Sequence, residues 1–68
     1  MMTIIINDRS HSYNEDSITI EGILHSMKKS NAGTAVALNG MLIRKEKWAV
    51  TLVKDGDSVT IISAAFGG

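Results

Sequence analysis

A single segment of this chain has the apolar spacing of an amphipathic helix, whereas the other apolar runs have the composition of β-strands. Between Thr19 and Lys29, the apolar residues recur at the interval that places them on one helical face: Ile20, Ile23, Leu24 and Met27. The hydroxyl of Thr19 can cap the first turn, and the cations Lys28 and Lys29 suit the last turn. One helix must bury this face against a sheet built from the remaining residues.

The expected strands are short and separated by turn signals. The run from Thr3 to Ile6 is rich in β-branched residues and ends at Asn7-Asp8. Further strands are expected over residues 10–14, 34–38, 41–43, 51–53 and 58–64. Asn39-Gly40 and the stretch 54–57 are the clearest tight turns between them. Residues 44–48 favour a short helical turn, with Trp48 covering the edge of the core.

The first and last strands are the most apolar, so we expect them side by side at the centre of the sheet. In the last strand, Val59 and Ile61 should point to one side and Thr60 and Ile62 to the other. The predicted fold is α+β, a β-grasp in which one amphipathic helix packs on a mixed sheet of four to five strands. Residues 1–64 form the domain, and residues 65–68 form a free C-terminal tail.

Composition excludes several classes of function. Seven Lys and Arg residues balance seven Asp and Glu residues, which argues against a nucleic-acid partner or a polybasic membrane anchor. No cysteine is present, so disulfides, thiolate nucleophiles and cysteine-based metal sites are ruled out. His11 and His25 have no acidic residue at ligand spacing, so we expect no metal site and no catalytic site. Without a signal peptide or a spanning apolar run, the protein is expected in the cytoplasm.

The end of the chain is the strongest candidate for chemistry. Gly67 and Gly68 have no Cβ atoms, so this thin backbone can enter a narrow channel of another enzyme. A terminal carboxyl group has a pKa of about 3.5, is ionised at neutral pH and is therefore a poor electrophile. Conversion to an acyl adenylate removes that obstacle, and sulfur that displaces AMP leaves a thiocarboxylate at Gly68. The alternative is an inert, frayed end.

Apolar residues near the end suggest where a partner docks. In an extended register, Ile62, Ala64 and Phe66 share one side of the chain. An exposed apolar patch of this kind suits protein–protein contact. We therefore expect docking through Ile62 and Ala64 and recognition of the tail through Phe66 and Gly67. In the competing interpretation, Phe66 packs onto the sheet of its own domain.

Several motifs together resemble the ThiS family over essentially the whole chain. They are the Thr-initiated helix with Ile23-Leu24, Ala37-Leu38-Asn39, Ile43-Arg44 followed by Trp48, Asp55-Gly56-Asp57, and the terminal Gly67-Gly68. The spacing between the arginine and the tryptophan, the Asp-Gly-Asp turn and the terminal glycines are specific only in combination. Phe66 departs from the family pattern, in which a smaller residue often precedes the two glycines.

This resemblance implies a ubiquitin-like β-grasp fold and a sulfur carrier of thiamine biosynthesis. It further implies that an E1-like enzyme of the ThiF or MoeB type adenylates Gly68 with ATP, while the carrier binds no cofactor. Sulfur would come from a cysteine desulfurase relay and go to the thiazole synthase ThiG. Two alternatives stay open: the small subunit of molybdopterin synthase (MoaD-like), and a ubiquitin-like module that is conjugated to lysines. A structural adaptor with an inert tail is a third.

Overall fold

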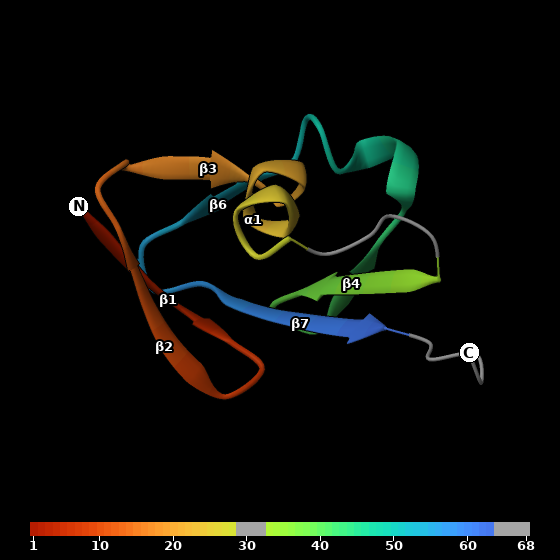
Figure 1. The fold of residues 1–68 in the computed structure, drawn as a ribbon, viewed down its shortest axis with the longest axis horizontal. Helices are drawn as coiled ribbons and strands as arrows, with labels where there is room; N and C mark the ends of the chain where they lie inside the picture. Colours follow the sequence, from red (N-terminus) through yellow and green to blue (C-terminus); the bar gives the residue numbers. More distant parts are fainter. Residues whose placement is uncertain (29–32, 64–68) are drawn as a thin grey trace.

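The computed structural model describes residues 1–28 and 33–63 of the chain, and Figure 1 shows their arrangement. The elements, in chain order, are β1 (Met2–Ile6), β2 (Arg9–Tyr13), β3 (Ser17–Thr19), α1 (Ile20–Ser26), β4 (Thr34–Leu38), β5 (Met41–Ile43), the 3₁₀ turn η1 (Lys45–Lys47), β6 (Leu52–Lys54) and β7 (Ser58–Ser63). A five-stranded sheet forms one layer, and α1 lies across one of its faces together with the pair β3–β6.

The last strand of the sequence is the middle strand of the sheet. The strand order is β2-β1-β7-β4-β5, with β7 parallel to β1 and antiparallel to β4. This arrangement confirms the prediction that the first and last strands are neighbours at the sheet centre. It also confirms an α+β fold with one helix on a mixed sheet of five strands.

Both hairpins of the sheet have two-residue turns that need left-handed backbone. Asn7 and Asp8 have φ values of 50° and 69°, and they connect the paired residues Ile6 and Arg9. Asn39 and Gly40 have φ values of 50° and 83°. Asn, Asp and Gly tolerate this conformation better than other residues, and it gives the turn the twist that a hairpin requires. The turn signals in the sequence therefore fix where β1 and β4 end.

Helix α1 begins where the sequence predicts and ends earlier. The hydroxyl oxygen of Thr19 accepts a hydrogen bond from the Gly22 N–H at 3.0 Å, as expected for the N-cap. The helix stops at Ser26, whose hydroxyl donates to the Ile23 carbonyl at 2.8 Å. Lys28 then adopts a φ of 58°, which cannot continue a right-handed helix. The placement of Lys28 in the last helical turn was therefore wrong, and Lys29 lies outside the described residues.

The pair β3–β6 is the part of the fold that the sequence did not predict. Residues 17–19 form β3, which pairs antiparallel with β6 through Ile18 and Val53. Strand β6 was expected at 51–53 and lies at Leu52–Lys54. Gly22 explains how α1 can follow β3 so closely, because a Cβ atom at residue 22 would lie 2.9 Å from Cγ1 of Ile18.

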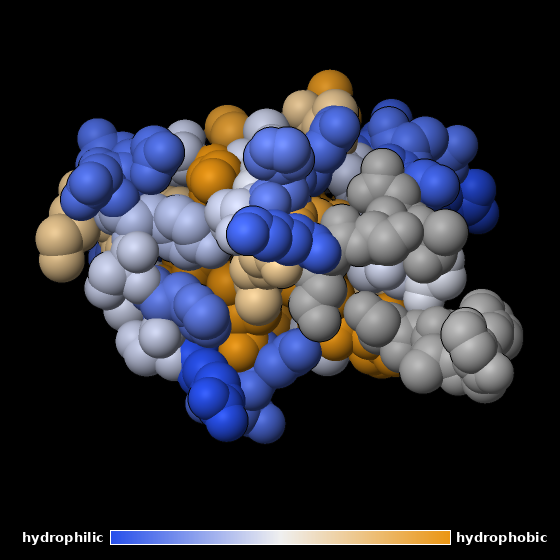
Figure 2. Space-filling model, in the orientation of Figure 1, coloured by the Kyte–Doolittle hydropathy of each residue, from blue (hydrophilic) through white to orange (hydrophobic). Residues whose placement is uncertain are grey.

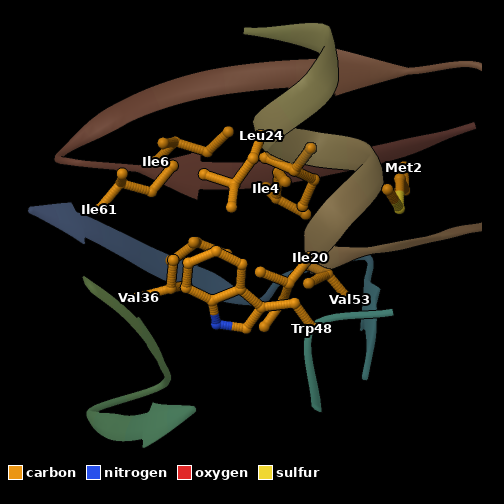
Figure 3. Close-up of a cluster of buried hydrophobic side chains, with 11 residues drawn as sticks. Met2, Ile4, Ile6, Ile20, Leu24, Val36, Trp48, Val53 and Ile61 are labelled. Atoms are coloured by element: carbon orange, nitrogen blue, oxygen red, sulfur yellow. The ribbon is translucent and has the colours of Figure 1, made fainter. Parts of the chain in front are cut away.

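The core lies between α1 and the sheet, as Figure 3 shows. Its buried side chains are Met2, Ile4, Ile6, Ile20, Ile23, Leu24, Val36, Trp48, Val53, Val59 and Ile61. Trp48 is 3% exposed, and its indole N–H donates to the Ile43 carbonyl at 3.0 Å, so it closes one edge of the core as expected. Figure 2 shows apolar residues in the middle of this face, partly covered by polar residues. No described helix is long and apolar enough to cross a membrane.

Candidate functional site

The candidate site is the end of β7 and the residues that follow it. Ile62 belongs to β7 and is described. Ala64, Phe66, Gly67 and Gly68 lie outside the described residues, so the structure leaves their predicted roles untested. The structure does define β7, the strand that leads to this end of the chain, and the residues that hold β7 in place.

Strand β7 is supported along its length on the β4 side. Its residues pair with β4 from Val59 opposite Leu38 to Ser63 opposite Thr34. Its side chains alternate between the two faces of the sheet: Val59 and Ile61 are buried, whereas Thr60 and Ile62 are exposed, as the sequence predicted. The residues after Ser63 therefore continue from the middle of the sheet.

On the other side of β7, the neighbouring strand ends before β7 does. The paired residues of β1 and β7 are Ile5 with Ser58 and Ile6 with Val59. Beyond them, the backbone N–H of Asn7 donates to the Val59 carbonyl at 3.0 Å. The side chain of Asn7 then contacts Ile61: its amide nitrogen donates to the Ile61 carbonyl at 3.0 Å, and its carbonyl oxygen accepts from the Ile61 N–H at 2.8 Å. A side chain thus takes the place of the next residue of β1.

The start of β7 has a corresponding contact with Asn39. The Asn39 N–H donates to the Ser58 carbonyl at 2.7 Å, and its side-chain oxygen accepts from the Ser58 N–H at 2.9 Å. Its amide nitrogen donates to a carboxylate oxygen of Asp57 at 3.1 Å. Two asparagines in left-handed turns therefore hold the two ends of the described strand.

The open face of the sheet, which α1 does not cover, carries the candidate docking surface. Ile62 is 62% exposed and lies opposite Ala35 on β4. Ala37 of β4 lies between Thr60 of β7 and Leu42 of β5, and Leu42 is 69% exposed. Residues that pair across strands point to the same face. The apolar patch on the open face is thus formed by Ile62, Ala35, Ala37 and Leu42.

The sequence predicted an exposed position for Ile62, and it did not single out Leu42, which lies on the same face. The run from Met41 to Ile43 is apolar at every position, so its pattern does not tell which side chains face the core. The pairing of Leu42 with Ala37 decides the question, and a register of this kind is set by tertiary contacts. Thr3 and Ile5 of β1 and Ser10 and Ser12 of β2 extend the same face without any charge.

The acidic residues near β7 accept hydrogen bonds from backbone N–H groups. A carboxylate oxygen of Asp55 accepts from the Thr3 N–H at 2.8 Å, and one of Asp57 accepts from the Lys54 N–H at 2.8 Å. The Asp57 contact closes the turn over residues 54–57, as the sequence predicted, whereas the Asp55 contact joins this turn to β1. Among residues 1–28 and 33–63, no group of three or more His, Asp or Glu side chains is placed to hold a metal ion, and no pocket is found.

Comparisons with known proteins agree on one family. The model of the ThiS family matches residues 4–68. The sulfur carrier protein ThiS of Escherichia coli is 30% identical over 67 residues, which is 98% of this chain and 100% of that protein. A crystal structure of the thiamine biosynthesis protein ThiS from Geobacter metallireducens superimposes with a TM-score of 0.85 at 29% identity, covering 98% of this chain and 100% of that one. A solution NMR structure of a thiamine biosynthesis protein from the same organism gives a TM-score of 0.83 at 30% identity, covering 98% and 88%.

Proposed function

The chain belongs to the ThiS family, and from that premise we propose that it is a sulfur carrier protein of thiamine biosynthesis. It acts as a co-substrate with no catalytic site of its own, and the reacting group is the terminal carboxylate of Gly68. One observation carries the proposal: the family match runs to residue 68 and so includes Gly67 and Gly68. The name of the Escherichia coli relative, which this chain matches over that protein's whole length, supports it.

The proposed chemistry takes place at one carbon atom. A carboxylate oxygen of Gly68 attacks the α-phosphorus of ATP in the partner's active site, and pyrophosphate leaves. The carbonyl carbon of the resulting acyl adenylate is electrophilic, because AMP is a good leaving group. Attack by sulfide forms the carbon–sulfur bond, breaks the bond to AMP and leaves a thiocarboxylate. In the cell, a cysteine desulfurase relay supplies the sulfur, and the thiazole synthase ThiG receives it.

The fold supports this role by giving the tail a fixed origin. Strand β7 lies between β1 and β4, and its pairing with β4 sets its path as far as Ser63. A terminus that enters another protein binds more tightly when its point of attachment is already ordered, because less conformational entropy is lost on binding.

The apolar patch on the open face is the proposed docking surface for the E1-like adenylating enzyme. It lies on the strand that leads to Gly68, and exposed Ile62 is part of it. A few well-packed residues carry most of the energy of a protein interface. The patch contains no charge that would need to be desolvated.

The experiment is an intact-mass measurement after the chain is incubated with an E1-like adenylating enzyme of the ThiF type, ATP and sulfide. We expect a mass increase equal to the exchange of one oxygen atom for sulfur, and fragmentation should place it at Gly68. The matched control is a chain with one alanine appended after Gly68, which moves the carboxylate away from its place in the channel. This variant should fold normally and gain no sulfur.

The other outcomes separate the competing functions. Adducts of higher mass on lysines would indicate a conjugated ubiquitin-like module. Sulfur at Gly68 that passes to a molybdopterin synthase and not to ThiG would indicate a MoaD-like carrier. No change in mass with an enzyme that is active on its own carrier, or equal sulfur in the alanine-extended chain, would contradict the proposal.

A further inference from the structure

We propose that Asn7 is a positioning residue for sulfur transfer, because its side chain holds the end of β7 from which Gly68 is presented. The effect on sulfur transfer rests on the proposed function, whereas the stabilisation of β7 by Asn7 rests on hydrogen-bond geometry. Asn7 touches neither substrate nor cofactor in this proposal. It acts through the backbone of Ile61.

The neighbouring strands β1 and β7 do not end at the same level. Strand β1 ends at Ile6, opposite Val59, whereas β7 continues to Ser63. The Val59 and Ile61 carbonyls both point to the β1 side, since both accept hydrogen bonds from Asn7. Without the Asn7 side chain, the backbone N–H and carbonyl of Ile61 would have no partner on that side among the described residues.

Only a carboxamide satisfies both the backbone N–H and the carbonyl of Ile61 at once. The Ile61 N–H requires an acceptor and the Ile61 carbonyl requires a donor, and the Asn7 side chain carries one of each. This requirement fixes the orientation of the amide. A carboxylate has no proton to donate, and a hydroxyl cannot span both groups. The left-handed backbone of Asn7, with φ of 50°, turns the side chain back toward β7.

The contact between Asn7 and Ile61 should affect how well the partner enzyme binds the carrier. Strand ends open at low cost in free energy, so the last residues of a strand are the first to fray. Two hydrogen bonds together shift the balance between the paired and the open strand end by about tenfold. Partner affinity falls in proportion to the fraction of molecules in the competent form. Loss of the Asn7 side chain should therefore raise the KM for the carrier in adenylation and leave kcat unchanged.

The structure supplies a matched control in Asn39. Asn39 also has φ of 50° and also sits in a two-residue hairpin turn. Its side chain also makes two hydrogen bonds, one to the backbone of β7 and one to the carboxylate that precedes this strand. Its contacts are to Asp57 and Ser58, at the end of the strand that is remote from Gly68. Glycine keeps the left-handed backbone at either position and removes only the side chain. Asn7→Gly and Asn39→Gly should therefore lose similar global stability.

Two measurements on these variants test the proposal. The first is hydrogen exchange at the backbone amide of Ile62, which faces β4 because successive amides alternate along a strand. Asn7→Gly should accelerate this exchange by about tenfold more than Asn39→Gly does. The second is the kinetics of adenylation by the E1-like enzyme. Asn7→Gly should raise the KM by up to about tenfold with kcat unchanged, and Asn39→Gly should leave both close to wild type.

The outcomes are distinguishable from failure of the proposed function. If the wild-type chain is not adenylated, the proposed function fails, while the hydrogen-exchange comparison still tests the contact. Equal exchange at Ile62 in both variants, or an equal KM for both, would overturn the role of Asn7. If Asn7→Gly does not fold, Asn7→Asp replaces it, since aspartate keeps the acceptor for the Ile61 N–H and lacks the donor. An unchanged KM in Asn7→Asp would overturn the proposal equally.

Discussion

At the scale of single residues, Gly22 shows that an apparent defect in a helix is a packing requirement. Glycine within a helix is less favourable than alanine by about 1 kcal/mol, so the sequence alone suggests a weak point. In the structure, Ile18 occupies the space that a side chain at residue 22 would take. The oxygen of the N-cap Thr19 lies 3.2 Å from the same position. The helix and β3 approach each other because this residue has no Cβ atom.

We predict that Gly22→Ala destabilises the protein by about 1 kcal/mol, because an overpacking cost of about 2 kcal/mol exceeds the gain in helix propensity. Urea unfolding followed by circular dichroism measures the change. The control is the same substitution in an Ile18→Ala background, where the obstructing side chain is gone. There Gly22→Ala should stabilise the protein by about 1 kcal/mol. The same sign in both backgrounds would show that Ile18 is not the cause.

The asparagines mark the limit of what a sequence can predict at this scale. Asn7-Asp8 and Asn39-Gly40 were recognisable as turns, because left-handed backbone is a local preference of these residue types. The hydrogen bonds of the Asn7 side chain to Ile61 join residues that are 54 positions apart. No local pattern contains a contact of that kind. Gly68 became a candidate for the opposite reason, since its proposed role depends on its position in the chain alone.

At the scale of elements, the open face of the sheet combines exposed apolar side chains with small neutral ones. Ile62 and Leu42 are both more than half exposed, and the residues that pair beside them are alanine or threonine. Val50 is another exposed apolar residue, at 72%, but it precedes Thr51, whose carbonyl accepts from the first N–H of α1. Val50 therefore lies on the helix side of the sheet.

This difference gives a matched pair of substitutions. Ile62→Glu should weaken binding to the adenylating enzyme by about tenfold or more, because the charge would have to be buried at the interface. Val50→Glu introduces the same charge at a site of similar exposure and should leave the affinity within about twofold of wild type. Titration calorimetry with the adenylating enzyme measures both. Equal affinities for the two variants would remove the open face from the docking surface.

The elements that sequence reasoning located were those with a local signature. Helix α1 was placed by its apolar spacing and its cap, and the strands of the large sheet by β-branched runs and turns. Strand β3 escaped prediction because its three residues become a strand only by pairing with β6, far away in the sequence. The early end of α1 escaped for a related reason. It depends on a Ser26 side chain that competes for a backbone carbonyl.

At the scale of the whole molecule, the buried core residues in the described part of the chain lie between Met2 and Ile61. Strand β7 provides Val59 and Ile61 to this core and joins β1 to β4. The sheet thus consists of two halves that only β7 connects: β2–β1 and β4–β5. The boundary at residue 64 remains a prediction, in which this folded unit is separate from the residues proposed to carry the chemistry.

We predict that removal of residues 65–68 changes the melting temperature by less than about 4 °C, the shift that about 1 kcal/mol produces in a small domain. Removal of residues 58–68 deletes β7 and should give an unfolded chain. Circular dichroism and one-dimensional NMR check both. A large loss of stability on removing 65–68 would mean that the predicted boundary is wrong.

The central place of β7 has a consequence for how the protein is made. Ribosomes synthesise a chain from its N-terminus, so the strand that completes the sheet emerges after all the others. The nascent protein has no closed sheet until translation has passed Ser63. A product of premature termination before Ser58 lacks the strand that joins the two halves and remains a substrate for proteases.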